Sequence, residues 1–132
     1  MAERLNNAAR NRQVDSIGDD LNSGTLKIYT GAQPASADDA ASGTLLVTIN
    51  LPADAMAAAA TGTAAKSGTW SGVAAATGTA GWFRIENSGA TRRYDGAVTA
   101  TGGGGEIELD STSITSGQTV LINTFSITQP AS

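Results

Sequence analysis

The chain has 132 residues with 8 basic and 12 acidic side chains, so it is the size of one ordinary domain and carries a formal net charge of −4 at pH 7. This balance lacks the basic excess of a protein that binds DNA or RNA directly. Cysteine and histidine are both absent, which excludes disulfides, thiolate or imidazole metal sites and the commonest general base in catalysis.

Hydrophobic residues make up 40% of the chain, but much of this share is alanine, and only 2 Trp, 2 Tyr and 2 Phe occur. Small side chains bury little area, so at about 25 cal/mol per Å² we expect a thin core that self-association or docking would supplement. The N-terminus is polar, and no run approaches the roughly 20 apolar residues of a membrane span. We therefore expect a protein that is made in the cytoplasm, is soluble there and contacts no membrane.

The first 23 residues differ from the rest, because they show a helical rather than an alternating pattern. Large apolar side chains approximate one helical stripe: Leu5, Val14, Ile17 and Leu21. The stripe predicts a helix over roughly residues 3–21, and Gly24 suits the C-terminal cap. We interpret residues 1–23 as a partly helical arm that orders against a partner through these four side chains.

From residue 24 onward, short β-branched runs are separated by turn residues, which predicts strands. The expected strands lie at 25–30, 43–51, 69–75, 79–86, 92–99, 106–110 and 119–129. Residues 31–39 are rich in breakers and predict a loop, residues 53–66 predict a loop or irregular edge, and the glycines at 102–105 predict a flexible connector. The turn at residues 87–90 predicts a hairpin.

This spacing indicates a mostly β chain. Short strands with glycine-rich turns are typical of an antiparallel β-sandwich or jelly-roll-like domain, here over residues 24–130. Within the run 79–86, alternation places Trp82 and Arg84 on one face and Phe83 and Ile85 on the other. Because Trp82 and Phe83 are adjacent, they lie on opposite faces, so one of the two aromatic side chains points outward or into another layer.

One row of carboxylates is a candidate for chemistry. Glu106, Glu108 and Asp110 alternate along one strand face, with adjacent members about 6.6–6.8 Å apart. Such a row could serve a Ca²⁺ site or glycoside hydrolysis. Alternation alone explains it as the solvated face of a half-buried strand, and we favour that interpretation. The glycines at 102–105 lack the lysine of a phosphate loop, so we predict no catalytic residue, no cofactor and no metal site.

The two tryptophans allow two interpretations. Trp70 and Trp82, with Tyr94, could form a stacking platform for sugars, as in a carbohydrate-binding adhesion module. Aromatic side chains are also enriched at protein interfaces and in small β cores. We favour a packing or partner-contact role for Trp70 and Trp82.

Several segments carry a family resemblance. They are Gly24–Asp38 (GTLKIYTGAQPASAD), Gly43–Thr48 (GTLLVT), Gly78–Arg84 (GTAGWFR), Asp95–Val98, Glu106–Thr112 (EIELDST) and Ser116–Val120 (SGQTV). Together they resemble a widespread group of small proteins encoded in the structural modules of tailed phages and prophages. The likeness covers about residues 22–130.

The resemblance implies a structural virion protein. The expected function is that of a capsid decoration (cement) protein, a homo-oligomer that docks on the major capsid protein or other virion proteins and stabilises the head shell. Its location would be the virion, assembled in the host cytoplasm. A tail, neck or head-fibre adaptor and a carbohydrate-binding adhesion module are the alternatives, and a hydrolase is the most remote one.

Overall fold

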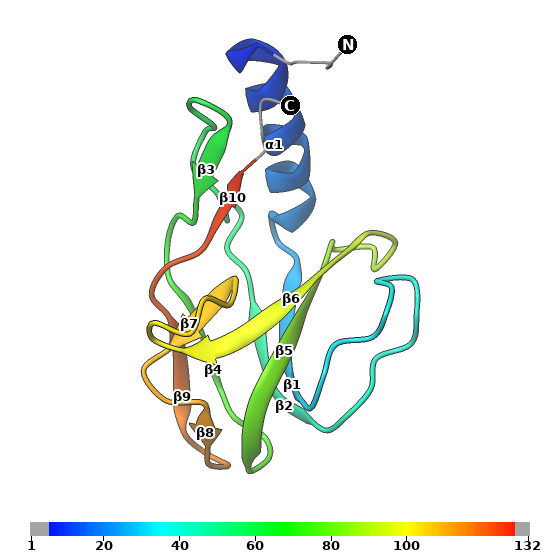
Figure 1. Ribbon diagram of the computed structural model, residues 1–132, viewed down its shortest axis with the longest axis vertical. Helices are drawn as coiled ribbons and strands as arrows, with labels where there is room; N and C mark the ends of the chain where they lie inside the picture. Colours follow the sequence, from blue (N-terminus) through cyan, green and yellow to red (C-terminus); the bar gives the residue numbers. More distant parts are fainter. Residues whose placement is uncertain (1–5, 129–132) are drawn as a thin grey trace.

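The computed structural model describes residues 6–128, which form a curled, mixed β-sheet with one N-terminal helix (Figure 1). The elements are α1 (Asn7–Leu21), β1 (Thr25–Thr30), β2 (Leu45–Asn50), β3 (Thr63–Ala65), β4 (Trp70–Val73), β5 (Gly78–Glu86), β6 (Arg93–Ala100), β7 (Ile107–Leu109), β8 (Ser113–Ile114), β9 (Thr119–Ile122) and β10 (Ser126–Thr128). The prediction of a mostly β chain is confirmed. No helix among the described residues is long and apolar enough to cross a membrane.

The main sheet has the strand order β2-β1-β5-β6-β7, and β8 pairs with the start of β5. β4 lies next to β2 at the edge of the main sheet, where Val47 and Ala74 form a bridge. On its other side, β4 pairs antiparallel with β9. The sheet therefore curls until β9 lies near β7. Four strands pair antiparallel as predicted, but β6 and β7 run parallel, so the expectation of a purely antiparallel domain is wrong at this edge.

The glycine run explains how two neighbouring parallel strands are joined by a short connection. Such pairs ordinarily need a crossover of about a dozen residues or more. Here Gly102 and Gly104 adopt positive φ angles of 89° and 85°, and a Cβ atom on Gly103 would lie 2.6 Å from Cβ of Thr99. Glu108 accepts a hydrogen bond from the Gly104 amide at 2.9 Å. The glycines at 102–105, predicted to form a flexible connector, form a compact loop that packs against Thr99 of β6 and leads into β7.

Helix α1 belongs to the domain and is not a separate arm. Figure 1 shows α1, β3 and β10 together at one end of the curled sheet. Val14 and Leu21 belong to the same buried cluster as the sheet residues. Side chains of the helix and its C-cap also accept hydrogen bonds from backbone amides of the 55–62 segment: Asn11 from Gly62 (2.7 Å), Asp15 from Ala59 (2.8 Å) and Asn22 from Ala55 (2.9 Å).

The end of the helix differs from the expected glycine cap. The residue in the left-handed conformation is Ser23, with φ 57°. Gly24 serves a different purpose, because a Cβ atom there would lie 2.4 Å from the carbonyl oxygen of Glu86. The missing side chain therefore lets the start of β1 approach the end of β5.

The core lies on the inner face of the curled sheet. Phe125 lies at its aromatic centre, with ring centroids 5.4 Å from Trp70, 5.9 Å from Phe83 and 5.9 Å from Tyr94. Turning Phe125 inward interrupts the strand that alternation predicts over 119–129. The chain forms β9 and β10 instead, and β10 pairs with β3 in the segment expected to be irregular.

Candidate interaction surfaces

The outer face of the main sheet carries a cluster of aromatic and charged side chains. The strand register places Tyr29 opposite Trp82, and Lys27 opposite Arg84, which in turn faces Asp95. The Tyr29 and Trp82 rings stack with centroids 4.7 Å apart and planes 15° from parallel. The guanidinium carbon of Arg84 lies 5.3 Å from the centroid of the Trp82 ring, within cation–π range.

Ion pairs join three strands across this face. Arg84 donates from Nε to Oδ1 of Asp95, and Glu86 pairs with Lys27 on β1 at 3.2 Å and with Arg93 on β6 at 3.5 Å. Hydrogen bonding to Asp95 raises the pKa of Arg84 above its ordinary value, against the opposing effect of burial. These charges therefore hold β1, β5 and β6 together.

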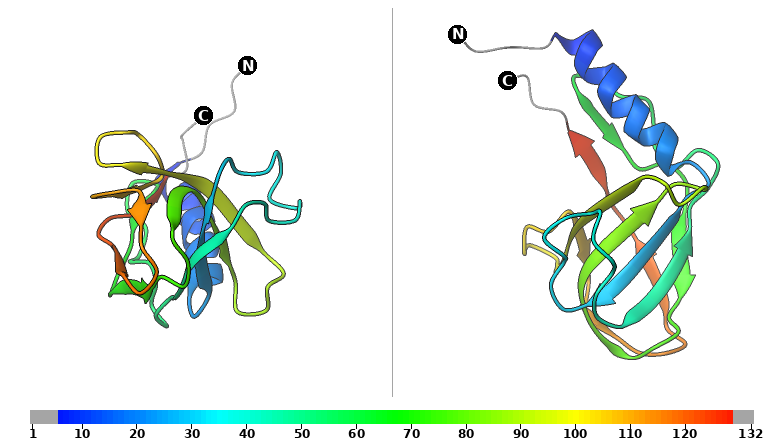
Figure 2. Two further views of the ribbon diagram at one scale, coloured as in Figure 1. Left: turned by 90° about the horizontal axis from the view of Figure 1, so that it is seen from below. Right: turned by 90° about the vertical axis from the view of Figure 1, so that its right-hand side faces the viewer.

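Loop 31–44 lies over this outer face. The right-hand view of Figure 2 shows the loop, in cyan, in front of the sheet. Arg93 donates to the carbonyl oxygens of Ala37 (3.3 Å) and Asp38 (3.5 Å). A Cβ atom on Gly81 would lie 1.9 Å from the carbonyl oxygen of Gly31, so the glycine lets the base of the loop approach β5. Most of the loop residues are themselves exposed.

Both tryptophans are fully buried, Trp70 in the core and Trp82 on the outer face of the main sheet. Trp70 and Trp82 are both 0% exposed, so neither ring offers a face to a sugar in this structure. Trp70 donates from Nε1 to the carbonyl oxygen of Ser67 at 3.2 Å. Nε1 of Trp82 is buried and has no hydrogen-bond partner among residues 6–128.

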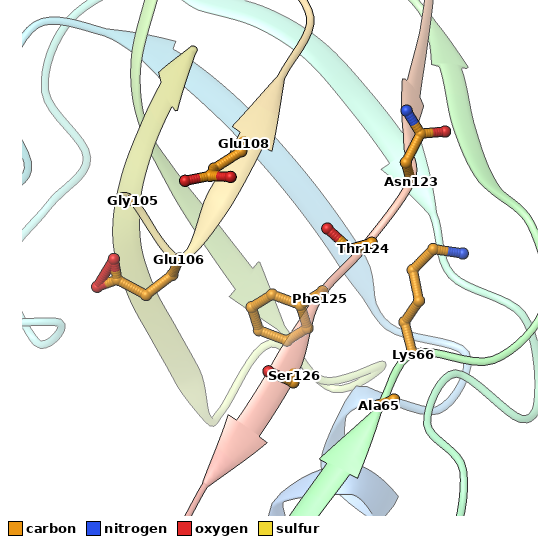
Figure 3. Close-up of a pocket in the computed structure, with 9 residues that line it drawn as sticks. All are labelled: Ala65, Lys66, Gly105, Glu106, Glu108, Asn123, Thr124, Phe125 and Ser126. Atoms are coloured by element: carbon orange, nitrogen blue, oxygen red, sulfur yellow. The ribbon is translucent and has the colours of Figure 1, made fainter. Parts of the chain in front are cut away.

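An open groove of about 520 Å³ lies between the β7 edge and the 123–126 segment, as shown in Figure 3. Its charged side chains do not converge, because Lys66 and Glu106 extend away from each other on opposite sides of Phe125. Lys66 donates to the carbonyl oxygen of Gly68 at 2.8 Å. The groove therefore shows no acid–base pair arranged around a common point.

The predicted carboxylate row lies along β7 and its flanks. Glu106 and Asp110 are exposed, whereas Glu108 is half-buried and bonded to the Gly104 amide. Across the described range, no three carboxylate, thiolate or imidazole side chains gather as a metal site would require. The row consists of separate surface carboxylates, one of which supports the glycine turn.

The side chains predicted to contact a partner take different positions. Val14, Leu21, Trp70 and Trp82 are at most 3% exposed, so they pack inside their own chain and leave no surface for a partner. For Val14 and Leu21 the partner-contact prediction is corrected, because the helical stripe faces the core of this domain. For Trp70 and Trp82, burial agrees with the packing role and not with the partner-contact role. Ile17 is half-buried and lines a 220 Å³ cleft beneath the ion pair of Arg92 with Asp20 (3.0 Å). Leu5 lies outside the described residues.

A second exposed surface was missed by the sequence reasoning. The large hydrophobic side chains that remain exposed within 6–128 are Leu45 (38%), Val73 (62%) and Leu121 (48%). All three lie on the β2, β4 and β9 part of the sheet. The signal was present in the alternation of β4, where Trp70 faces inward and Val73 outward, but it required knowing which strands are neighbours.

Comparison with known proteins gave no match: no family model, no curated protein and no solved structure matches the chain.

Proposed function

We propose that the chain is a structural virion protein of a tailed bacteriophage, and specifically a capsid decoration protein that docks on the head shell and stabilises it. Its partners are the major capsid protein and further copies of itself, and its place is the virion, after assembly in the host cytoplasm. It acts by non-covalent contact, without enzymatic activity or a cofactor. The resemblance over residues 22–130 motivates this proposal.

One structural observation supports it most strongly. Two of the resembling segments, 24–38 and 78–84, are far apart in sequence but form a single unit. They pair along β1 and β5, with Tyr29 stacked on Trp82, and loop 31–44 rises from this pair. These two of the six resembling segments thus build one surface, which is expected when a shared surface performs a shared task.

Loop 31–44 is our candidate for the contact with the shell. It is long for a connection without secondary structure, and such loops are usually functional when a rigid scaffold positions them. Its scaffold is the ion-paired outer face described above, and Arg93 holds its middle through the carbonyl oxygens of Ala37 and Asp38. Helix α1, which we expected to be the anchor, packs inside the domain and presents polar side chains such as Arg12 and Gln13.

The physical logic of this function needs no chemistry. A domain that bridges neighbouring shell subunits adds buried contact area to a thin shell. Each contact can be weak, because many copies on a symmetric lattice act together through avidity.

Add-back to capsids tests the proposal. Purified protein is mixed with capsids that lack it, and bound copies are counted after sedimentation. Decoration predicts saturation in proportion to the number of shell subunits. No binding, or binding only at the few positions of a neck or tail, would contradict it, and the second result would indicate an adaptor.

A loop variant locates the contact. Replacing residues 33–41 by a short Gly-Ser linker should leave thermal unfolding nearly unchanged but reduce capsid binding strongly. Asp110→Lys, an exposed charge change outside the loop, is the control and should bind as the unmodified protein does. Equal binding by the loop variant would reject loop 31–44 as the contact.

A further inference from the structure

Two strand edges of the curled sheet face each other without pairing. β7 is the last strand of the main sheet, and β9 pairs only with β4. Cα atoms of β7 and β9 come within 8 Å of each other, but the two strands form no ladder, which requires a spacing of about 4.8 Å. Beyond β9, the chain continues along the same seam as the 123–126 segment. The groove of about 520 Å³ lies between this segment and residues 105–108 (Figure 3).

The backbone on both walls of the groove offers unpaired hydrogen-bonding groups. The Thr101 amide donates to the carbonyl oxygen of Leu109 at 3.0 Å, so the backbone of Leu109 faces β6. Because successive strand residues direct their N–H and C=O to alternate sides, those of Glu108 point away from β6, on the side of the groove. On the opposite wall, Asn123 and Thr124 are exposed and make no backbone hydrogen bond to another described residue.

An extended polypeptide strand has the groups that these two walls lack. In β-strand addition, main-chain hydrogen bonds hold an incoming peptide and its alternate side chains decide which peptide fits. The hollow between β9 and the end of β7 is smaller, at about 200 Å³, so the strand would enter beside the 123–126 segment. There it would extend the main sheet beyond β7.

The side chains of the β7 wall select the charge of that strand. Glu106 is exposed and has no ion-pair partner among the described residues, and Glu108 lies two residues further on the same side. The cation of the opposite wall, Lys66, donates to the carbonyl oxygen of Gly68 and extends away from Glu106. A basic side chain on a strand paired with β7 would therefore meet carboxylates, and opposite charges across neighbouring strands are stabilising.

The same carboxylates disfavour a second copy of this chain. Pairing two β7 edges would place glutamates opposite glutamates, and charged edges of this kind protect a sheet against edge-to-edge association. We propose that the groove between β7 and the 123–126 segment binds an extended strand of a partner protein that carries lysine or arginine at alternate positions.

Peptides of defined charge test this proposal on the full chain. The probe is a capped six-residue peptide of alternating lysine and valine, and the comparison peptide alternates glutamate and valine. In NMR titrations, the basic peptide should saturably shift the backbone amides of Glu108, Asn123 and Thr124, and should leave that of Ser88, in the turn between β5 and β6, unchanged. The Glu108 amide should exchange with solvent at least about tenfold more slowly at saturation, because it gains an acceptor.

Matched variants separate strand pairing from general attraction. Glu106→Lys should weaken binding of the basic peptide at least about threefold. Asp110→Lys makes the same change of charge outside the groove, about 13 Å along the strand and beyond the Debye length of about 8 Å, and should bind nearly as the unmodified protein does. Methylation of alternate backbone nitrogens of the peptide should abolish binding, because it removes donors that a strand uses. Circular dichroism should show both variants folded.

Several results would overturn the proposal. These are equal binding of the two peptides, equal losses in the two variants, unchanged binding of the methylated peptide, and no amide shifts at millimolar peptide. Because the assay contains no capsid, its result is independent of whether the protein decorates a phage head.

Discussion

Arg84 and Asp95 face each other across β5 and β6 and form a two-pronged ion pair, with Nε to Oδ1 at 2.8 Å and Nη2 to Oδ2 at 2.9 Å. Their side chains are 3% and 5% exposed. A buried pair of this kind contributes little net stability compared with a hydrophobic pair, but losing one partner leaves a buried charge. The pair therefore acts chiefly to fix the register of β6 against β5 beneath loop 31–44.

Removing one partner of this pair should be costly. Asp95→Leu or Arg84→Met alone should lower the free energy of unfolding by about 3–5 kcal/mol, since each leaves an uncompensated buried charge. The double variant should lose less than the sum of the two. Urea denaturation of the four proteins measures the coupling, and additive losses would show that the pair is not energetically linked.

The two buried tryptophans provide a matched comparison. Trp70 donates its indole N–H to Ser67, whereas that of Trp82 has no partner within the described residues. Trp70→Phe removes a hydrogen bond, whereas Trp82→Phe removes an unsatisfied buried donor. We expect Trp82→Phe to be less destabilising by on the order of 1–3 kcal/mol in chemical denaturation. An equal or larger loss for Trp82→Phe would mean that its N–H is satisfied in solution.

Helix α1 should be required for folding. Leu21→Ala should lower the free energy of unfolding by about 2–5 kcal/mol, because it leaves a cavity in the shared core. Gln13→Ala, on the exposed side of the helix, is the control and should change it little. Deletion of residues 1–23 should abolish cooperative thermal unfolding. A truncated chain that still unfolds cooperatively would restore the view of this segment as a separate arm.

Tyr94 should make the free energy of unfolding depend on pH in alkaline solution. Burial, assisted by the negative charge of Glu106, raises the pKa of Tyr94 above its ordinary value of 10.0. In the unfolded chain the phenol ionises near that ordinary value, whereas in the fold it stays neutral to higher pH. Its contribution to stability is thus complete below about pH 10 and is lost as the pH rises through the folded pKa.

Tyr94→Phe keeps the ring and removes this titration. Its free energy of unfolding should therefore fall less steeply above pH 10 than that of the unmodified protein. Urea denaturation at several alkaline pH values measures the two slopes. Equal slopes would show that Tyr94 ionises alike in the folded and unfolded chains.

Local pattern predicted most of the strands, because period-two alternation reports directly on burial. The hairpin of β5 and β6 and the two faces of β5 follow from residues 79–99 alone. The parallel placement of β7 could not be predicted, since it depends on glycine backbone packing against Thr99. The helical stripe of α1 was predicted to contact another protein, but Val14 and Leu21 pack in the core of their own chain. A stripe shows that a helix face is buried, but not whether its own chain or another one buries it.

The candidate surfaces were less accessible to sequence reasoning than the strands. Trp82 and Phe83 lie on opposite faces of β5, as alternation predicts, but alternation does not show that Trp82 takes the outer face or that it is fully buried there. The exposed hydrophobic surface on β2, β4 and β9 combines residues from 45 to 121 that only the sheet order brings together. Long-range strand pairing, which alternation does not encode, decides both cases.

A reconstruction of intact particles that contain this chain tests the central claim most directly. A decoration protein should give density for the β domain on the outer surface of the head, repeated in register with the shell lattice, with loop 31–44 against the major capsid protein. Density confined to the neck or tail, or the absence of the chain from purified particles, would contradict it.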